Sequence, residues 1–99
     1  MKVFKNYRNE DCYLTVEQEE HIQSRHPEAS ADFITQCLMA PMEIRKSSSH
    51  SLAHLYYVLK TEERFFCVVL KYCSGGNFIS TAYTTTRMKI GEIIYKEGV

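Results

Sequence analysis

The chain has 99 residues, 44% of them apolar, and equal numbers of acidic and basic residues. This length and composition predict one globular domain over residues 1–99 with a modest core, and they exclude an intrinsically disordered chain. The zero net charge argues against binding of nucleic acid through a strongly basic face, but it is compatible with a cleft that contacts a few phosphates.

No segment predicts export or membrane insertion. The longest near-continuous apolar run, 65–70, is far shorter than the ~20 residues of a membrane helix, and the first residues lack the apolar region of a signal peptide. The cysteines show neither a C-x-x-C pair nor zinc-ribbon spacing, so we expect free thiols in a reducing, cytoplasmic compartment. We expect no membrane partner. These cysteines are Cys12, Cys37, Cys67 and Cys73.

Residues 2–14 mix charged and aromatic side chains and predict a short extended segment followed by a turn. Thr15 is a favourable N-cap, and Gln18 stands three residues later, as a capping box requires. These residues predict a first helix from about 16 to 25. The helix is expected to end before Pro27, because the residue that precedes a proline disfavours the α conformation.

A second helix is predicted from about 31 to 39, with Ser30 as its N-cap. Its apolar residues recur at helical spacing, and Pro41 follows its end. Because isolated helices of this length are marginal in water, both helices must pack on another part of the chain. The apolar residues of the second helix are Phe33, Ile34, Cys37 and Leu38.

The rest of the chain predicts a meander of about four antiparallel strands. β-branched and aromatic residues are frequent in these segments, and polar turns separate them at 61–64 and at 74–77, which contains a Gly-Gly pair. Residues 90–95 fit either a last short strand or a packed tail. We therefore predict an α+β domain with two N-terminal helices packed on one face of an antiparallel sheet. The four strands are 42–46, 55–60, 65–72 and 78–84.

Titratable side chains are most concentrated at the end of the first predicted helix. His21 and Arg25 are four residues apart and share one helix face, and His26 follows directly. Histidine gains or loses a proton near neutral pH, and arginine binds phosphate through a planar fork. These residues are compatible with the edge of an active site. From the residues alone, a solvated helix end, where the helix dipole favours cations, explains them slightly better.

The last of the four predicted strands carries a row of hydroxyl groups. With Arg87 and Lys89 beyond the strand, these groups could bind the phosphate of a nucleic acid, although β-sheet propensity alone also explains them. Strict alternation predicts one face with Phe78, Ser80, Ala82 and Thr84 and the other with Ile79, Thr81 and Tyr83.

Other aromatic and imidazole groups have two interpretations. Tyr57 belongs either to the core or to a surface on which a base stacks. His50 and His54 flank a serine-rich loop, but they lack ligand spacing and no group of carboxylates accompanies them. We therefore predict no metal site and no cofactor.

Several blocks of the sequence resemble those of a known family. They are Leu14-Thr15-x-Glu17-x-x-x-His21-Ile22-x-x-Arg25-His26-Pro27-Glu28, Tyr56-Tyr57, Ser80-Thr81-Ala82-Tyr83 and Lys89-x-Gly91. Together they are similar to the phage-associated members of the Barnase–EndoU–Colicin E5/D–RelE-like (BECR) nuclease family. The resemblance extends from about residue 14 to residue 95. It implies a barnase- or RelE-like fold and metal-independent cleavage of RNA in a cleft between helix and sheet.

The resemblance also implies roles for individual residues. One group removes the proton of a ribose 2′-OH, another protonates the leaving 5′-oxygen, and cations stabilise the phosphorane. His21 is the favoured proton-transfer group, because its position in the helix fixes its direction, whereas His26 stands at a fraying end. The expected catalytic residues are His21, Arg25, His26, Tyr83 and Lys89, and the expected substrate-binding residues are Tyr57, Thr81, Thr84 and Arg87.

Three hypotheses follow. The first is a ribonuclease, either a toxin of a toxin–antitoxin pair or a prophage effector, with RNA and an antitoxin or immunity protein as partners. RelE-like toxins are usually strongly basic, so the neutral charge argues against binding to the ribosome. The second is a non-catalytic module that binds a nucleic acid or a protein, in which the same residues form a polar groove. The third is a domain of which only the fold can be predicted.

Overall fold

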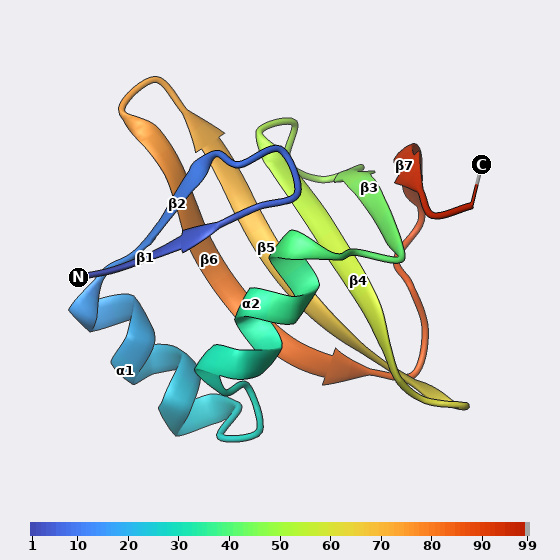
Figure 1. The fold of residues 1–99 in the computed structure, drawn as a ribbon, viewed down its shortest axis with the longest axis horizontal. Helices are drawn as coiled ribbons and strands as arrows, with labels where there is room; N and C mark the ends of the chain where they lie inside the picture. The colour runs from blue at the N-terminus through green and yellow to red at the C-terminus, as the bar shows by residue number, and fades with distance from the viewer. Residues whose placement is uncertain (99) are drawn as a thin grey trace.

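The computed structural model describes residues 1–98, and within them the chain forms seven strands and two helices (Figure 1). All the strands belong to one sheet, in the order β1-β2-β6-β5-β4-β3-β7. β2 and β6 are parallel, and every other neighbouring pair is antiparallel. The elements are β1 (Lys2–Lys5), β2 (Asp11–Leu14), α1 (Val16–Arg25), α2 (Ala31–Met39), β3 (Glu43–Ser47), β4 (Ala53–Thr61), β5 (Arg64–Cys73), β6 (Gly76–Thr85) and β7 (Gly91–Lys96).

The predicted fold class is wrong. About 49% of the residues are in strands and 19% in helices, so the protein is mainly β, and its sheet is mixed. The difference arises at both ends of the chain. β1 and β2 have four residues each and form a hairpin that adds to one side of the sheet, and β7 adds to the other side. Strands this short give little local signal, and their place depends on partners distant in sequence.

Both helices have the predicted bounds. The Thr15 hydroxyl accepts a hydrogen bond from the Gln18 backbone N–H at 3.2 Å, and the Ser30 hydroxyl accepts one from the Phe33 N–H at 3.3 Å. Each cap satisfies a backbone donor that the first turn of a helix leaves free. These local interactions therefore determine where the helices begin.

The sheet curls around its core, with α2 packed against β1, β4 and β5 on the inner side (Figure 1). Tyr7, in the turn after β1, lies 4.9 Å from Tyr95 of β7 and 6.1 Å from Tyr56 of β4 between ring centroids. The two outer parts of the sheet therefore approach each other at this end. The core on the inner face includes Phe4, Leu14, Ile22, Ile34, Leu38, Ile44, Phe66, Val68, Leu70, Ile79 and Ala82.

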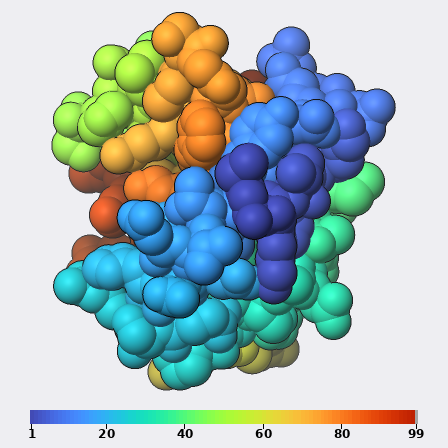
Figure 2. Space-filling model, turned by 90° about the vertical axis from the view of Figure 1, so that its left-hand side faces the viewer, coloured from blue at the N-terminus to red at the C-terminus, as the bar shows by residue number. Residues whose placement is uncertain are grey.

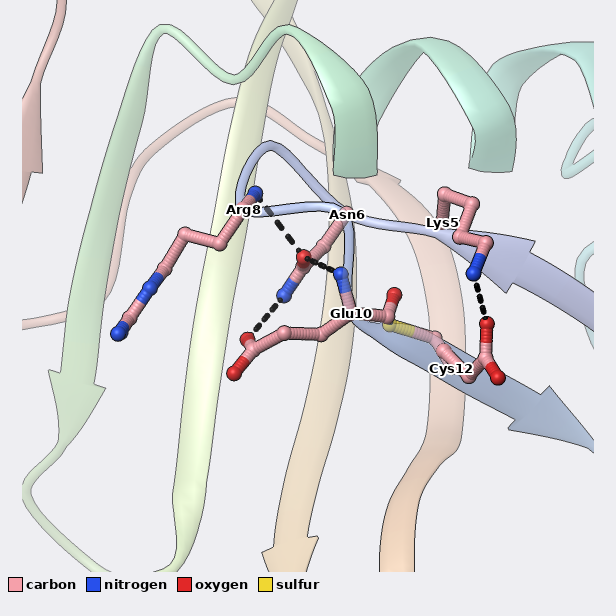
Figure 3. A network of polar contacts seen from close by, with 6 residues as sticks. Lys5, Asn6, Arg8, Glu10 and Cys12 are labelled. Carbon is pink, nitrogen blue, oxygen red and sulfur yellow. Dashed lines mark hydrogen bonds and ion pairs between the residues drawn. The ribbon is translucent and has the colours of Figure 1, made fainter.

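The side chain of Asn6 is buried and forms hydrogen bonds within the turn of the β1–β2 hairpin (Figure 3) and with β4. Its oxygen accepts hydrogen bonds from the backbone N–H groups of Arg8 and Glu10, at 3.0 and 2.9 Å. Its nitrogen donates to Glu10 Oε1 at 2.8 Å and to the Tyr56 hydroxyl at 3.3 Å. The amide thus satisfies two backbone donors of the turn and connects the turn to β4.

A second, smaller cluster lies on the outer face of the sheet, and we refer to it as the outer cluster. The segment 86–90 connects β6 to β7 and crosses over this face, with Met88 packed against it. The Lys89 N–H donates to the Tyr57 hydroxyl at 3.0 Å, and Arg45 Nη1 donates to the Lys89 carbonyl at 2.8 Å. The outer cluster consists of Leu55, Tyr57 and Cys67, with Phe65, Val69, Tyr83 and Met88 around them.

Gly91→Ala tests the pairing of β7 with β3. An ideal Cβ at Gly91 would lie 2.2 Å from the backbone oxygen of Lys46, so a methyl group forces β7 away from β3. We expect a loss of about 1–3 kcal/mol in the free energy of unfolding, measured with urea, as is typical of overpacking. Gly75→Ala is the control, because no atom lies within 4 Å of its added Cβ. Equal stability of the two variants would contradict the close approach of β7 and β3.

Candidate functional site

The candidate site forms along a part of β6 that, among the described residues, has no neighbouring strand on one side. β2 pairs with β6 at Cys12↔Asn77 and Tyr13↔Phe78 and then diverges from it. An unpaired strand edge exposes backbone donors and acceptors. Here α1 and the turn after it cover the edge: Gln18 Nε2 donates to the Ser80 carbonyl, and Glu28 Oε2 accepts from the Thr84 N–H at 3.3 Å.

A β-bulge at Ser80 determines which side chains of β6 share a face. Ile79 pairs with Leu70 and Thr81 pairs with Val69, so Ser80 has no partner in β5. The extra residue reverses the alternation from that point on. The predicted faces are therefore wrong: Ile79 shares the inner face with Ala82, and Phe78 lies on the outer face, the side of Thr81 and Tyr83.

Four residues meet at the end of α1, and we name them the Tyr83 cluster: His26, Glu28, Tyr83 and Lys89. The centroids of the His26 and Tyr83 rings are 5.8 Å apart, and Lys89 Nζ lies 5.9 Å from the Tyr83 centroid. Glu28 Oε2 is 3.8 Å from His26 Nδ1. The cluster thus brings an imidazole, a carboxylate and an ammonium around one aromatic ring.

The backbone of His26, which the sequence places at a fraying helix end, forms a hydrogen bond on each side. Its backbone N–H donates to the Ile22 carbonyl at 2.6 Å, and its carbonyl accepts from the Ala29 N–H at 2.9 Å. Its side chain is 37% exposed, which leaves it accessible to a ligand. Two backbone hydrogen bonds and the contact with Tyr83 therefore fix its orientation.

Glu28 remains an anion at neutral pH. Burial by itself would raise the pKa of its carboxyl, but hydrogen bonds from its own backbone N–H and from Thr84 outweigh burial. The nearby His26 acts in the same direction, and the pKa is lowered. The charged carboxylate thus lies beside the His26 ring, 3.8 Å from Nδ1, where it favours the protonated imidazole.

The hydroxyl of Tyr83 does not face the surface. It is buried, and within the described residues it has no hydrogen-bond partner. Burial and the neighbouring Cys67 thiol raise the pKa of Tyr83, so the phenol stays protonated. The ring of Tyr83, and not its hydroxyl, is therefore the part that lies next to His26 and Lys89.

The expected substrate-binding residues divide into buried and exposed ones. Tyr57 is fully buried, burial raises its pKa to about 12, and its hydroxyl holds the backbone of Lys89. Thr84 pairs with Phe66, and its hydroxyl is buried. Thr81 is partly exposed on the outer face, and Arg87 is exposed beyond β6. Only the last two are accessible to a ligand.

His21 and Arg25 are exposed on α1. They stand three and seven residues after Gln18, which contacts β6, so helical geometry places them on the stripe that borders β6. Within residues 1–98, neither side chain forms an ion pair. The structure therefore brings His26, Tyr83 and Lys89 together and leaves His21 and Arg25 beside them on the helix surface.

Two residues that position the site were not predicted to belong to it: Gln18, noted only for capping, and Glu28, present only in the motif string. Their contacts join segments far apart in sequence, and no local pattern indicates them. In the described part of the chain, no group of three or more histidine, cysteine, aspartate or glutamate residues could hold a metal ion.

Comparison with known proteins identifies no relative: no family model matches the chain, and neither a curated protein nor a solved structure matches it. Within residues 1–98, neither helix is long and apolar enough to cross a membrane.

Glu28→Gln tests the charge of the Glu28 carboxylate. Because the pKa of Glu28 is lowered in the folded state, its charge stabilises the fold above the ordinary pKa of 4.5, and this contribution is lost as the pH falls through the lowered pKa. We expect the variant to be less stable than the wild type at pH 7 and the difference to be smaller at about pH 3, below the ordinary pKa.

The measurement is urea unfolding of both proteins at the two pH values. Glu20→Gln, at an exposed position of α1, is the matched control and is expected to change stability by less than about 0.5 kcal/mol. A difference of equal size at both pH values would show that the carboxylate charge of Glu28 does not stabilise the fold.

Proposed function

We propose that the protein is a metal-independent ribonuclease that cleaves RNA at the Tyr83 cluster. The observation that carries the proposal is that His26 and Lys89 pack around the same ring, so that the imidazole and the ammonium are no more than about 12 Å apart. Transphosphorylation needs a group that exchanges a proton and a cation that stabilises the phosphorane. The cluster supplies both at one exposed patch. The resemblance to the BECR nucleases favours the same reaction.

In the proposed reaction a base removes the proton of the ribose 2′-OH, and O2′ forms a bond to the adjacent phosphorus. The bond from phosphorus to O5′ breaks, an acid gives its proton to O5′, and a 2′,3′-cyclic phosphate remains. His26 acts as one of these two proton-transfer groups, because its side chain is accessible and the Glu28 carboxylate lies 3.8 Å from its Nδ1. Lys89 and Arg25 supply positive charge to the phosphorane.

The geometry favours His26 over His21 as the principal histidine. His26 contacts Tyr83 and is fixed by two backbone hydrogen bonds, whereas His21 lies exposed on the neighbouring stripe of α1. Catalytic groups must be held in place to act, so the fixed imidazole is the better candidate. His21 is then the candidate for the second proton transfer.

The proposed substrate is RNA, and the proposed biological role is that of a toxin or a prophage effector. An antitoxin or immunity protein would then inhibit it by covering the Tyr83 cluster. The neutral net charge favours a small site that contacts few phosphates over a broad basic surface.

A specific observation also supports a second function, a non-catalytic module that binds RNA. The Tyr83 phenol is buried and cannot protonate a leaving group at the surface. If His21 is not the second proton-transfer group, the site binds a phosphodiester without cleaving it.

The test is cleavage of a mixed-sequence RNA in EDTA, with the cyclic phosphate product identified by mass spectrometry. We expect His26→Ala to reduce the cleavage rate by about 10²- to 10⁴-fold, the usual contribution of general acid–base catalysis. His50→Ala, an exposed histidine of the serine-rich loop, is the matched control and should cleave at the wild-type rate.

Cleavage by His26→Ala at the wild-type rate would contradict the role of His26. Binding of RNA by the wild type without any cleavage would favour the non-catalytic module.

A further inference from the structure

A shallow groove of about 300 Å³ opens at the start of β6, where β2 diverges from it. Figure 2 shows this side of the molecule, with the orange start of β6 beside the blue residues of β1, β2 and α1. We name it the Phe78 groove. It is lined by Thr15, Gln18, Lys71, Phe78, Ile79 and Ser80.

The Phe78 groove combines an aromatic ring with a cation. Lys71 and Phe78 are directly opposite each other in β5 and β6, so their side chains leave the sheet on the same face. Both are partly exposed, and within residues 1–98 Lys71 has no ion pair. Thr15 and Gln18 already bond within the protein, so the ammonium of Lys71 is the free charged group of the groove.

The ring of Phe78 packs beside a second aromatic ring, that of Tyr13. Its centroid lies 5.6 Å from that of Tyr13, which in turn lies against Gly76. A Cβ added at Gly76 would be 3.2 Å from the Tyr13 ring, so the glycine leaves the space that this ring occupies. The two ring planes are tilted by 42° to each other, so Tyr13 packs beside Phe78 and limits its movement, and the Phe78 ring itself is the surface on which an unpaired base stacks.

We propose that the Phe78 groove binds one nucleotide of single-stranded RNA, with its base stacked on Phe78 and its phosphate at Lys71. The inference rests on the proposed function, because the scissile phosphate of the same strand lies at the Tyr83 cluster. Phe78 and Tyr83 are on the same face of β6, and their partners in β5, Lys71 and Cys67, are four residues apart, so the two positions are about 13 Å apart at ~3.3 Å per residue. A strand of a few nucleotides is long enough to contact both.

α1 borders the path between the two positions. Its beginning contacts Ser80 through Gln18, and the turn after its end contacts Thr84 through Glu28, so the helix runs alongside β6 in the same direction. The stripe with His21 and Arg25 therefore faces the RNA between the Phe78 groove and the Tyr83 cluster. The groove adds specificity for unpaired RNA, because a base within a duplex cannot stack on a protein ring.

The test uses a single-stranded RNA hexamer with 2′-O-methyl groups throughout, which cannot undergo transphosphorylation, and measures its binding by fluorescence anisotropy. We expect Phe78→Leu, which keeps apolar volume but removes the ring, to weaken binding about tenfold or more, the size of one lost base stack. Phe65→Leu in the outer cluster is its matched control and should bind as the wild type does.

Lys71→Ala is the second variant, at a partly exposed position where the fold is retained even if Phe78→Leu unfolds. We measure the association constant for the hexamer between about 50 and 200 mM salt. The slope of its logarithm against the logarithm of the salt concentration should become shallower by about 0.7, the value for one phosphate contact on a single strand. Lys60→Ala, an exposed lysine at the other end of the sheet, should leave the slope unchanged.

Three outcomes are distinguishable when RNA cleavage is measured in parallel. If the wild type cleaves RNA but Lys71→Ala has the wild-type salt slope and folded Phe78→Leu binds normally, the groove is not a nucleotide site and the proposed function stands. If binding depends on Phe78 and Lys71 but no RNA is cleaved, the groove is supported and the catalytic function is overturned. Failure of the wild type to bind the hexamer even at low salt overturns the groove.

Discussion

The structure depends on how the open edge of β6 is closed. β2 pairs with the first residues of β6 and then leaves it, and an unpaired edge within a sheet is unstable against solvent and against other chains. α1 and the turn after it replace the missing strand through side chains: Gln18 satisfies the Ser80 carbonyl and Glu28 the Thr84 N–H. A helix covers the edge without continuing the ladder, and this brings polar side chains next to a β-strand.

The candidate site is a consequence of this closure. The helix that covers the edge ends at His26, and its C-cap places the imidazole against Tyr83, while the segment after β6 returns over the outer face and brings Lys89 to the same ring. The Glu28 carboxylate makes two of these contacts, since it accepts a hydrogen bond from the backbone of β6 and lies 3.8 Å from His26 Nδ1. The bulge at Ser80 determines that Phe78 shares the outer face with Tyr83.

The sequence predicted what depends on neighbours in the chain. The helix bounds follow from the hydroxyl caps at Thr15 and Ser30, and most strands follow from β-branched and aromatic runs. The fold class was wrong because β1, β2 and β7 are short, and their pairing is decided by distant strands. The bulge at Ser80 could not be predicted, because it exists only in the register with β5. The sequence likewise favours His21 over His26, because the contact of His26 with Tyr83 joins two elements that are distant in the chain and leaves no local pattern.

The most direct test of the account is an NMR titration of the four histidines with the 2′-O-methyl RNA hexamer. The C2 proton of each histidine is a separate probe. His21 and His26 report on the end of α1, and His50 and His54 report on the serine-rich loop and its border. If RNA binds at the Tyr83 cluster, the His26 resonance shifts on binding, the His21 resonance shifts to a smaller extent, and those of His50 and His54 do not shift. A hexamer that binds without shifting His26, or that shifts His50 and His54 instead, would contradict the claim that the Tyr83 cluster binds the RNA backbone.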